Sequence, residues 1–84
     1  MYRFEIDATP DPQALPRVAN VFAQRALVPA AITMNLLPTH IAIEVVVAGL
    51  DGAQAAVIAA KLGEGVAVLR SEAAAVDPPL RLAG

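Results

Sequence analysis

Strict alternation of apolar and polar residues marks the first element of the chain. From Tyr2 to Ala8 every second residue is apolar, and Arg3, Glu5 and Asp7 occupy the positions between them. Because successive side chains of a strand point to opposite faces, this pattern predicts a β-strand with one buried face. The segment 9–13 contains two prolines, which supply no ladder donors, so a loop follows the strand.

A β-hairpin is predicted in the middle of the chain. The segments 31–37 and 40–48 are rich in β-branched residues and flank a Pro38-Thr39 turn. The inner face of the second strand carries Ile41, Ile43, Val45 and Val47. Its outer face is only half polar, because it includes Ala42, Val46 and Ala48, and this composition suggests a partner that covers it.

Two helices are predicted between the strands. The first is amphipathic, with apolar residues three and four apart at Leu15, Val18, Ala19, Phe22, Ala23 and Ala26. It must begin only a few residues before Pro16, where a missing N–H has no intrahelical partner, and Thr9 or Asp11 can cap it. The second helix, over about residues 53–62, is alanine-rich, and Asp51 is its natural cap.

The order of the elements defines the predicted fold class. A last strand is expected over residues 66–71, which gives the order strand, helix, strand, strand, helix, strand. This is the ferredoxin-like βαββαβ arrangement, an α+β sandwich with a four-stranded antiparallel sheet and both helices on one face. We expect this domain to occupy residues 1–72, and residues 73–84 to form a C-terminal tail without a contribution to the core.

Composition supports one folded domain and makes self-association attractive. The chain has 84 residues, of which 57% are apolar and 17% charged, enough apolar surface for a core but too few residues for two domains. A domain this small buries only roughly 60–65% of the surface of its unfolded chain, so its stability alone is thin. Association with a second copy, giving a homodimer, would remedy that.

Charge and cysteine content exclude several classes of partner. The net charge is −2 and the basic residues are scattered, so no stripe of cations is available for nucleic acid. The chain has no cysteine, which excludes disulfides and thiol chemistry and suits a cytoplasmic protein. No apolar stretch approaches the ~20 residues that cross a bilayer, so neither export nor membrane association is expected.

Candidate catalytic chemistry is sparse. His40 is the single histidine, and we interpret it as a solvated strand residue. Asp7 and Asp11 are better explained as a strand surface residue and a helix cap than as paired carboxylates. No cluster of His, Asp and Glu has metal-binding spacing, and the first loop lacks an arginine cradle, a Cys-x-x-Cys pair and P-loop glycines. We therefore expect no enzyme activity, no cofactor and no metal.

A family resemblance arises in the first helix. Residues 14–25, Ala-Leu-Pro-Arg-Val-Ala-Asn-Val-Phe-Ala-Gln-Arg, resemble the first helix of the ACT domain in small, regulatory subunits of acetolactate synthase, where Gly-Ala-Leu-Ser-Arg-Val runs into Phe-Ser-Gln-Arg-Gly. Residues 66–70 resemble the last strand of that domain. The likeness spans about residues 2–72, and the short length is similar to subunits that consist of a single ACT domain.

The resemblance implies a binding site for an effector amino acid at a dimer interface. In the family, the loop after the first strand and the residues that open the second strand hold the effector. The corresponding candidates here are Pro10, Asp11, Pro12, Gln13, Ala14, Leu15, Val28, Ala30 and Ala31. Pro10, Gln13 and Val28 stand where the family has an asparagine, a glycine and a second asparagine. These departures weaken the expectation of feedback by valine.

Four hypotheses follow, in order of preference. The first is a non-catalytic subunit that dimerises and docks on a catalytic subunit such as acetolactate synthase, in branched-chain amino acid biosynthesis. The second is a free-standing sensor that binds an amino acid or another small effector at a homodimer interface. The third is a pairing domain without a ligand, and the last is an enzyme. The lost polar loop residues favour subunit pairing over amino-acid sensing.

Overall fold

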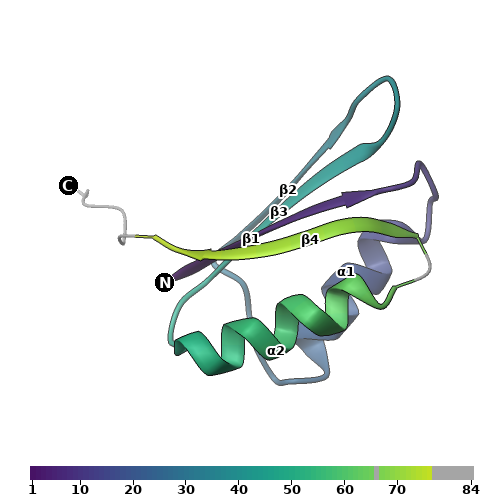
Figure 1. Cartoon of the computed structure of the whole chain (residues 1–84). Helices are drawn as coiled ribbons and strands as arrows, with labels where there is room; N and C mark the ends of the chain where they lie inside the picture. Colours follow the sequence, from purple (N-terminus) through teal and green to yellow (C-terminus); the bar gives the residue numbers. More distant parts are fainter. Residues whose placement is uncertain (66, 77–84) are drawn as a thin grey trace.

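Four strands and two helices follow in the predicted order. The structure is a computed structural model that describes residues 1–65 and 67–76. Its elements are β1 (Tyr2–Ala8), α1 (Ala14–Ala23), β2 (Ala31–Leu36), β3 (Ile41–Val47), α2 (Gly52–Gly63) and β4 (Val68–Ala75). All neighbouring strands are antiparallel, in the order β2-β3-β1-β4, and both helices lie on one face of the sheet (Figure 1). The predicted βαββαβ fold class is confirmed.

The core lies between the helices and the two central strands. Alternate residues of β1 and β3 are buried, as the sequence pattern predicts. Phe4 of β1 and Phe22 of α1 are both fully buried, and their rings meet edge to face with centroids 5.2 Å apart. The helices add the buried residues Ala14 and Val18 from α1, and Ala55, Ile58 and Leu62 from α2.

The start of α1 confirms one prediction and corrects another. The helix begins at Ala14, so Pro16 lies in its first turn, where proline is tolerated. The prediction that Thr9 or Asp11 caps α1 was wrong, because Gln13 precedes the first helical residue and no side chain caps the helix. The carboxylate of Asp11 instead accepts a hydrogen bond of 2.8 Å from the N–H of Gln13 and stabilises the loop.

The start of α2 is capped as predicted. The Asp51 carboxylate accepts from the N–H of Gln54 at 2.8 Å, and the Gln54 side chain accepts from the N–H of Asp51 at 3.1 Å. This reciprocal pair is a capping box, which satisfies two backbone donors at the helix start. Neither helix of the described part of the chain is long and apolar enough to span a membrane.

The last strand is longer than predicted. β4 runs to Ala75, beyond the predicted end at Ser71, and it therefore crosses the predicted boundary after residue 72. The reason is pairing along the whole of β1, from Ala8 opposite Val68 to Tyr2 opposite Ala75. Ala73, which the sequence assigned to the tail, packs against the core. The predicted strand start at residue 66 and the tail over residues 77–84 lie outside the described residues.

Edge strand β2 is not covered by the helices. All of its residues are exposed, although Ile32, Met34 and Leu36 pair with buried residues of β3 and so lie on the helix-facing side of the sheet. Their exposed fractions are 39%, 46% and 73%. The hairpin end of β2 and β3 extends past the helices (Figure 1), which leaves an apolar strip on a sheet edge.

Two leucines provide a matched test of the core. We expect Leu62→Ala to lower the free energy of unfolding by about 2–5 kcal/mol, because Leu62 is 2% exposed and the truncation leaves a cavity. Leu69→Ala removes the same atoms from a side chain that is 62% exposed, so its cost should stay below about 1 kcal/mol. Urea denaturation of both variants measures the difference, and equal costs would contradict this placement of the core.

Candidate functional site

The first loop and the tip of the hairpin form an apolar cleft. This loop cleft has a volume of about 450 Å³ and is lined by Pro10, Asp11, Pro12, Leu15, Pro16, Met34, Leu36 and Ile41. Among the residues that the structure describes, Asp11 is the only charged one in this lining, and one oxygen of its carboxylate already accepts the N–H of Gln13. The loop cleft thus offers apolar contact and little polar recognition.

Part of the predicted effector site gathers at this cleft. Pro10, Asp11, Pro12 and Leu15 line it together. Gln13 is exposed but does not line it, and Ala14 is only 2% exposed, so its side chain belongs to the core. Apolar residues of β2 and β3 complete the cleft, and the sequence prediction did not include them.

The remaining candidates lie at the other end of the sheet. Ala31 opens β2 opposite Val46, whereas Leu36, which lines the loop cleft, ends β2 opposite Ile41. At about 3.3 Å per residue, roughly 17 Å of strand separates these ends. Val28 and Ala30 precede Ala31 and are exposed, Val28 by 89%. A single copy therefore does not bring the two halves of the predicted site together.

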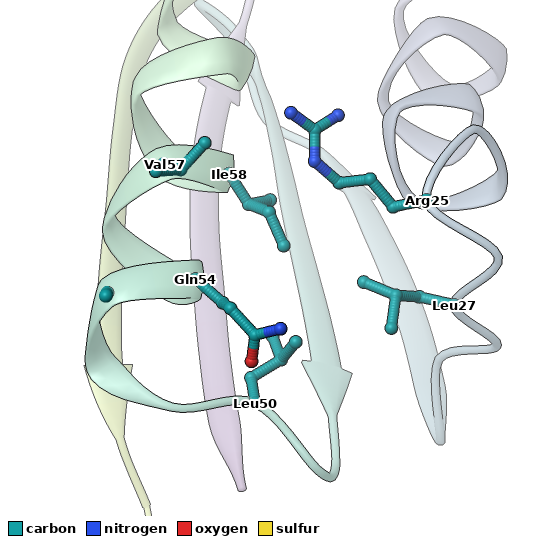
Figure 2. A pocket seen from close by; sticks show the side chains of 7 residues that line it. Arg25, Leu27, Leu50, Gln54, Val57 and Ile58 are labelled. Atoms are coloured by element: carbon teal, nitrogen blue, oxygen red, sulfur yellow. The ribbon is translucent and has the colours of Figure 1, made fainter.

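A second groove, which the sequence analysis missed, runs between α2 and the segment that follows α1. This helix groove has a volume of about 450 Å³, and its lining is Arg25, Leu27, Leu50, Ala53, Gln54, Val57 and Ile58 (Figure 2). Val57 is 57% exposed in a helix that is apolar on most of its surface. That unusual composition of α2 was the one sequence signal for an additional apolar surface.

The end of α1 positions two residues of the helix groove. Leu27 N–H donates to the Phe22 carbonyl at 3.0 Å and Ala26 N–H donates to the Ala23 carbonyl at 3.0 Å, which is the hydrogen-bond pattern of a Schellman motif. Ala26 has φ of 57°, the left-handed conformation that glycine normally supplies at this point. The reversal of the chain places Arg25 and Leu27 opposite α2 (Figure 2).

The open face of the sheet carries paired charges. Arg70 Nε donates to Asp7 Oδ2 at 2.9 Å, and its Nη1 lies 2.7 Å from Glu72 Oε1. Hydrogen bonds to Asp7 and then Glu72 raise the pKa of the Arg70 guanidinium above its ordinary value. Arg3 Nε lies 3.1 Å from Glu5 Oε2 and 3.7 Å from Glu44 Oε2. The apolar outer residues of β3 therefore share this face with a network of ion pairs.

His40 belongs to the same network. Its Nε2 lies 3.6 Å from Asp7 Oδ1, and its Nδ1 lies 3.0 Å from Thr39 Oγ1. The side chains of His40 and Asp7 are partly exposed at one end of the central strands, and neither residue lines the loop cleft or the helix groove. Within residues 1–65 and 67–76, no group of three His, Cys, Asp or Glu side chains could hold a metal ion. Asp7 and Arg70 of this surface ion network also line a hollow of about 340 Å³ on the open face, together with Glu5, Thr33 and Glu44.

Comparisons with known proteins identify the family and the fold. The ACT-like domain family matches residues 1–80, and the chain belongs to that family, a class of regulatory domains. The ACT domain from GTP pyrophosphokinase of Chlorobium tepidum is similar in structure, with a TM-score of 0.74 and 11% identity over 87% of this chain and 95% of that one.

A second structure is also similar to this chain. The C-terminal domain of the MgtC protein from Mycobacterium tuberculosis has a TM-score of 0.66 and 13% identity, over 87% of this chain and 83% of that one. At these identities the likeness shows the fold alone. A comparison with curated proteins finds no match.

The strained residue beside the helix groove gives a stability test. We expect Ala26→Gly to raise the free energy of unfolding by about 0.5–1 kcal/mol, because glycine adopts a φ of 57° without the steric cost that alanine bears. Ala60→Gly is the control, since Ala60 is exposed inside α2 and the same change there should cost about 1 kcal/mol. Thermal unfolding of the two variants shows whether each change stabilises or destabilises the chain. Destabilisation by Ala26→Gly would contradict the left-handed geometry.

Proposed function

We propose that this chain is a non-catalytic regulatory subunit that pairs with a second copy through β2 and docks, as a homodimer, on a catalytic subunit. The observation that carries the proposal is the exposure of every residue of β2, an edge strand whose helix-facing side presents Ile32, Met34 and Leu36. An exposed apolar edge strand has free backbone donors and acceptors and is a template for pairing with another strand. A small domain also gains the stability that it lacks by burying such a strip.

Pairing of two β2 strands would also reunite the separated halves of the predicted effector site. In an antiparallel pair related by a two-fold axis, the start of β2 in one copy lies beside the end of β2 in the other. Ala31 of the second copy would then approach Leu36 and the loop cleft of the first. The same pairing therefore supports the second candidate, a sensor that binds a small effector at the homodimer interface.

The catalytic partner that we propose is a synthase resembling acetolactate synthase, with thiamine diphosphate as the cofactor of the partner. This finer assignment rests on the resemblance of residues 14–25 to the first helix of the small subunits. The open face of the sheet, with its ion pairs, remains available for docking when β2 is occupied.

Substitution in β2 tests the pairing. We expect the full chain to sediment as a dimer and Met34→Glu to sediment as a monomer at micromolar concentration, because a carboxylate would be buried without a partner in the interface. Leu69→Glu is the matched control, since Leu69 is equally apolar and more exposed but lies on β4 at the opposite edge. A Met34→Glu variant that stays dimeric while folded, by circular dichroism, would refute pairing through β2.

The two candidate functions differ in what the dimer binds. Addition of the chain to a purified acetolactate synthase catalytic subunit should raise its activity, and the Met34→Glu variant should fail to do so. The sensor predicts instead that calorimetry detects binding of one of the common amino acids, with a rise in melting temperature. Absence of heat and of a thermal shift for every amino acid would eliminate an amino-acid sensor, and absence of activation would eliminate this synthase as the partner.

A further inference from the structure

The helix groove is a separate cavity from the surfaces that the proposed function uses. It shares no lining residue with the loop cleft, and no residue of β2 contributes to it. Its volume of about 450 Å³ lies within the range of small-molecule sites, roughly 300–1,000 Å³. The chemistry of its ligand can therefore be derived from its own side chains, whether or not two copies pair through β2.

The walls of the helix groove are apolar. Leu27 from the segment after α1 faces Val57 and Ile58 of α2 across the groove, and Leu50 closes one end (Figure 2). Ile58 is buried at its base with 2% exposure, whereas Val57 keeps 57% of its surface in contact with solvent. A branched aliphatic group placed between Leu27 and Val57 would remove apolar surface from water on both walls.

The lining side-chain groups of the groove that have no hydrogen-bond partner in the described part of the chain are donors. The Arg25 guanidinium points across the groove toward α2, and it forms no ion pair with any acidic residue in the described part of the chain. The Gln54 carbonyl oxygen already accepts the Asp51 N–H, so its free group is the amide nitrogen, which points into the groove (Figure 2). No Asp or Glu side chain of residues 1–65 and 67–76 lines the groove.

This distribution of donors selects for an anion and against an amine. A guanidinium beside an apolar wall binds a carboxylate through two parallel hydrogen bonds. The ammonium of an α-amino acid would lose water in the same groove without finding a carboxylate in return, which is unfavourable. We infer that the helix groove binds a small monocarboxylate with a branched aliphatic body and no ammonium group, such as a 2-oxo acid or a simple branched acid, with the carboxylate on Arg25.

The backbone at the end of α1 orients two side chains of the groove. Ala26, the residue between Arg25 and Leu27, holds a left-handed conformation that costs free energy for a residue with a Cβ. This conformation belongs to the Schellman motif that reverses the chain at the end of α1. Here it fixes Arg25 and Leu27, which supply the cation and one apolar wall.

Titration of the full chain with four small probes tests the inference. We expect 4-methylpentanoate and 4-methyl-2-oxopentanoate to bind with a Kd of roughly 1 mM, as suits so few non-hydrogen atoms. Leucine and 4-methylpentanamide should bind at least about tenfold more weakly, because one adds an unpaired ammonium and the other lacks the charge. Amide shifts in a ¹⁵N-labelled sample should map to Leu27, Leu50, Ala53 and Val57.

Two arginine variants test the contribution of the Arg25 charge to binding. Arg25→Gln should weaken the binding of 4-methylpentanoate roughly tenfold or more, which is the expected loss for a charge-assisted hydrogen bond. The weak binding of 4-methylpentanamide should stay unchanged. Arg17→Gln changes an exposed arginine of α1 outside the groove, and it should change the affinity for neither compound.

Three results would overturn the inference. The first is no shift of the groove amides at 10 mM carboxylate, and the second is shifts confined to Leu15, Met34 and Leu36 at the loop cleft. The third is an equal response to leucine and to 4-methylpentanoate. None of these results depends on sedimentation, so failure here is distinguishable from failure of β2 pairing.

Discussion

Burial of one face of the β1–β3 pair beneath the two helices is the interaction on which the rest of the structure depends. Alternate residues of both strands are buried, and Phe4 meets Phe22 at the centre of the contact. A chain of 84 residues has only enough apolar surface for one such core. The helices therefore cover the centre of the sheet and its β4 side and leave β2 exposed (Figure 1).

This asymmetry produces the surfaces that can carry function. The uncovered strand β2 forms an apolar edge, and where its end meets the first loop the loop cleft arises. The helix groove arises because the chain reverses sharply after Phe22 and leaves a gap beside α2. A regulatory domain needs surfaces of this kind more than it needs reactive groups, since its effect depends on which molecules it binds.

The open face of the sheet differs from the apolar surfaces. Its charged residues are already paired, with Arg70 between Asp7 and Glu72 and Arg3 between Glu5 and Glu44. Exposed pairs of this kind contribute little stability, about 0–1 kcal/mol each, and they are screened by salt. In protein interfaces, charges of this kind affect the choice of partner and the rate of association more than the affinity.

The sequence by itself determined the elements and the fold class, because those depend on local patterns. Alternation from Tyr2 to Ala8, the spacing around Phe22 and the cap at Asp51 are each encoded in neighbouring residues. The first loop was also predicted as half of an effector site, from resemblance. Pro10, Asp11, Pro12 and Leu15 line a cleft, and the effector site itself stays a prediction.

The tertiary structure alone decided the length of β4, the exposure of β2 and the helix groove, because each depends on contacts between residues that are distant in the sequence. β4 extends through a run of alanines with weak strand preference because β1 supplies its hydrogen bonds. The pattern of β2 resembles that of a buried strand, and only the position of the helices shows that Ile32, Met34 and Leu36 are exposed. The helix groove could not be predicted, since it unites Arg25 and Leu27 with Val57, and no local pattern encodes that contact.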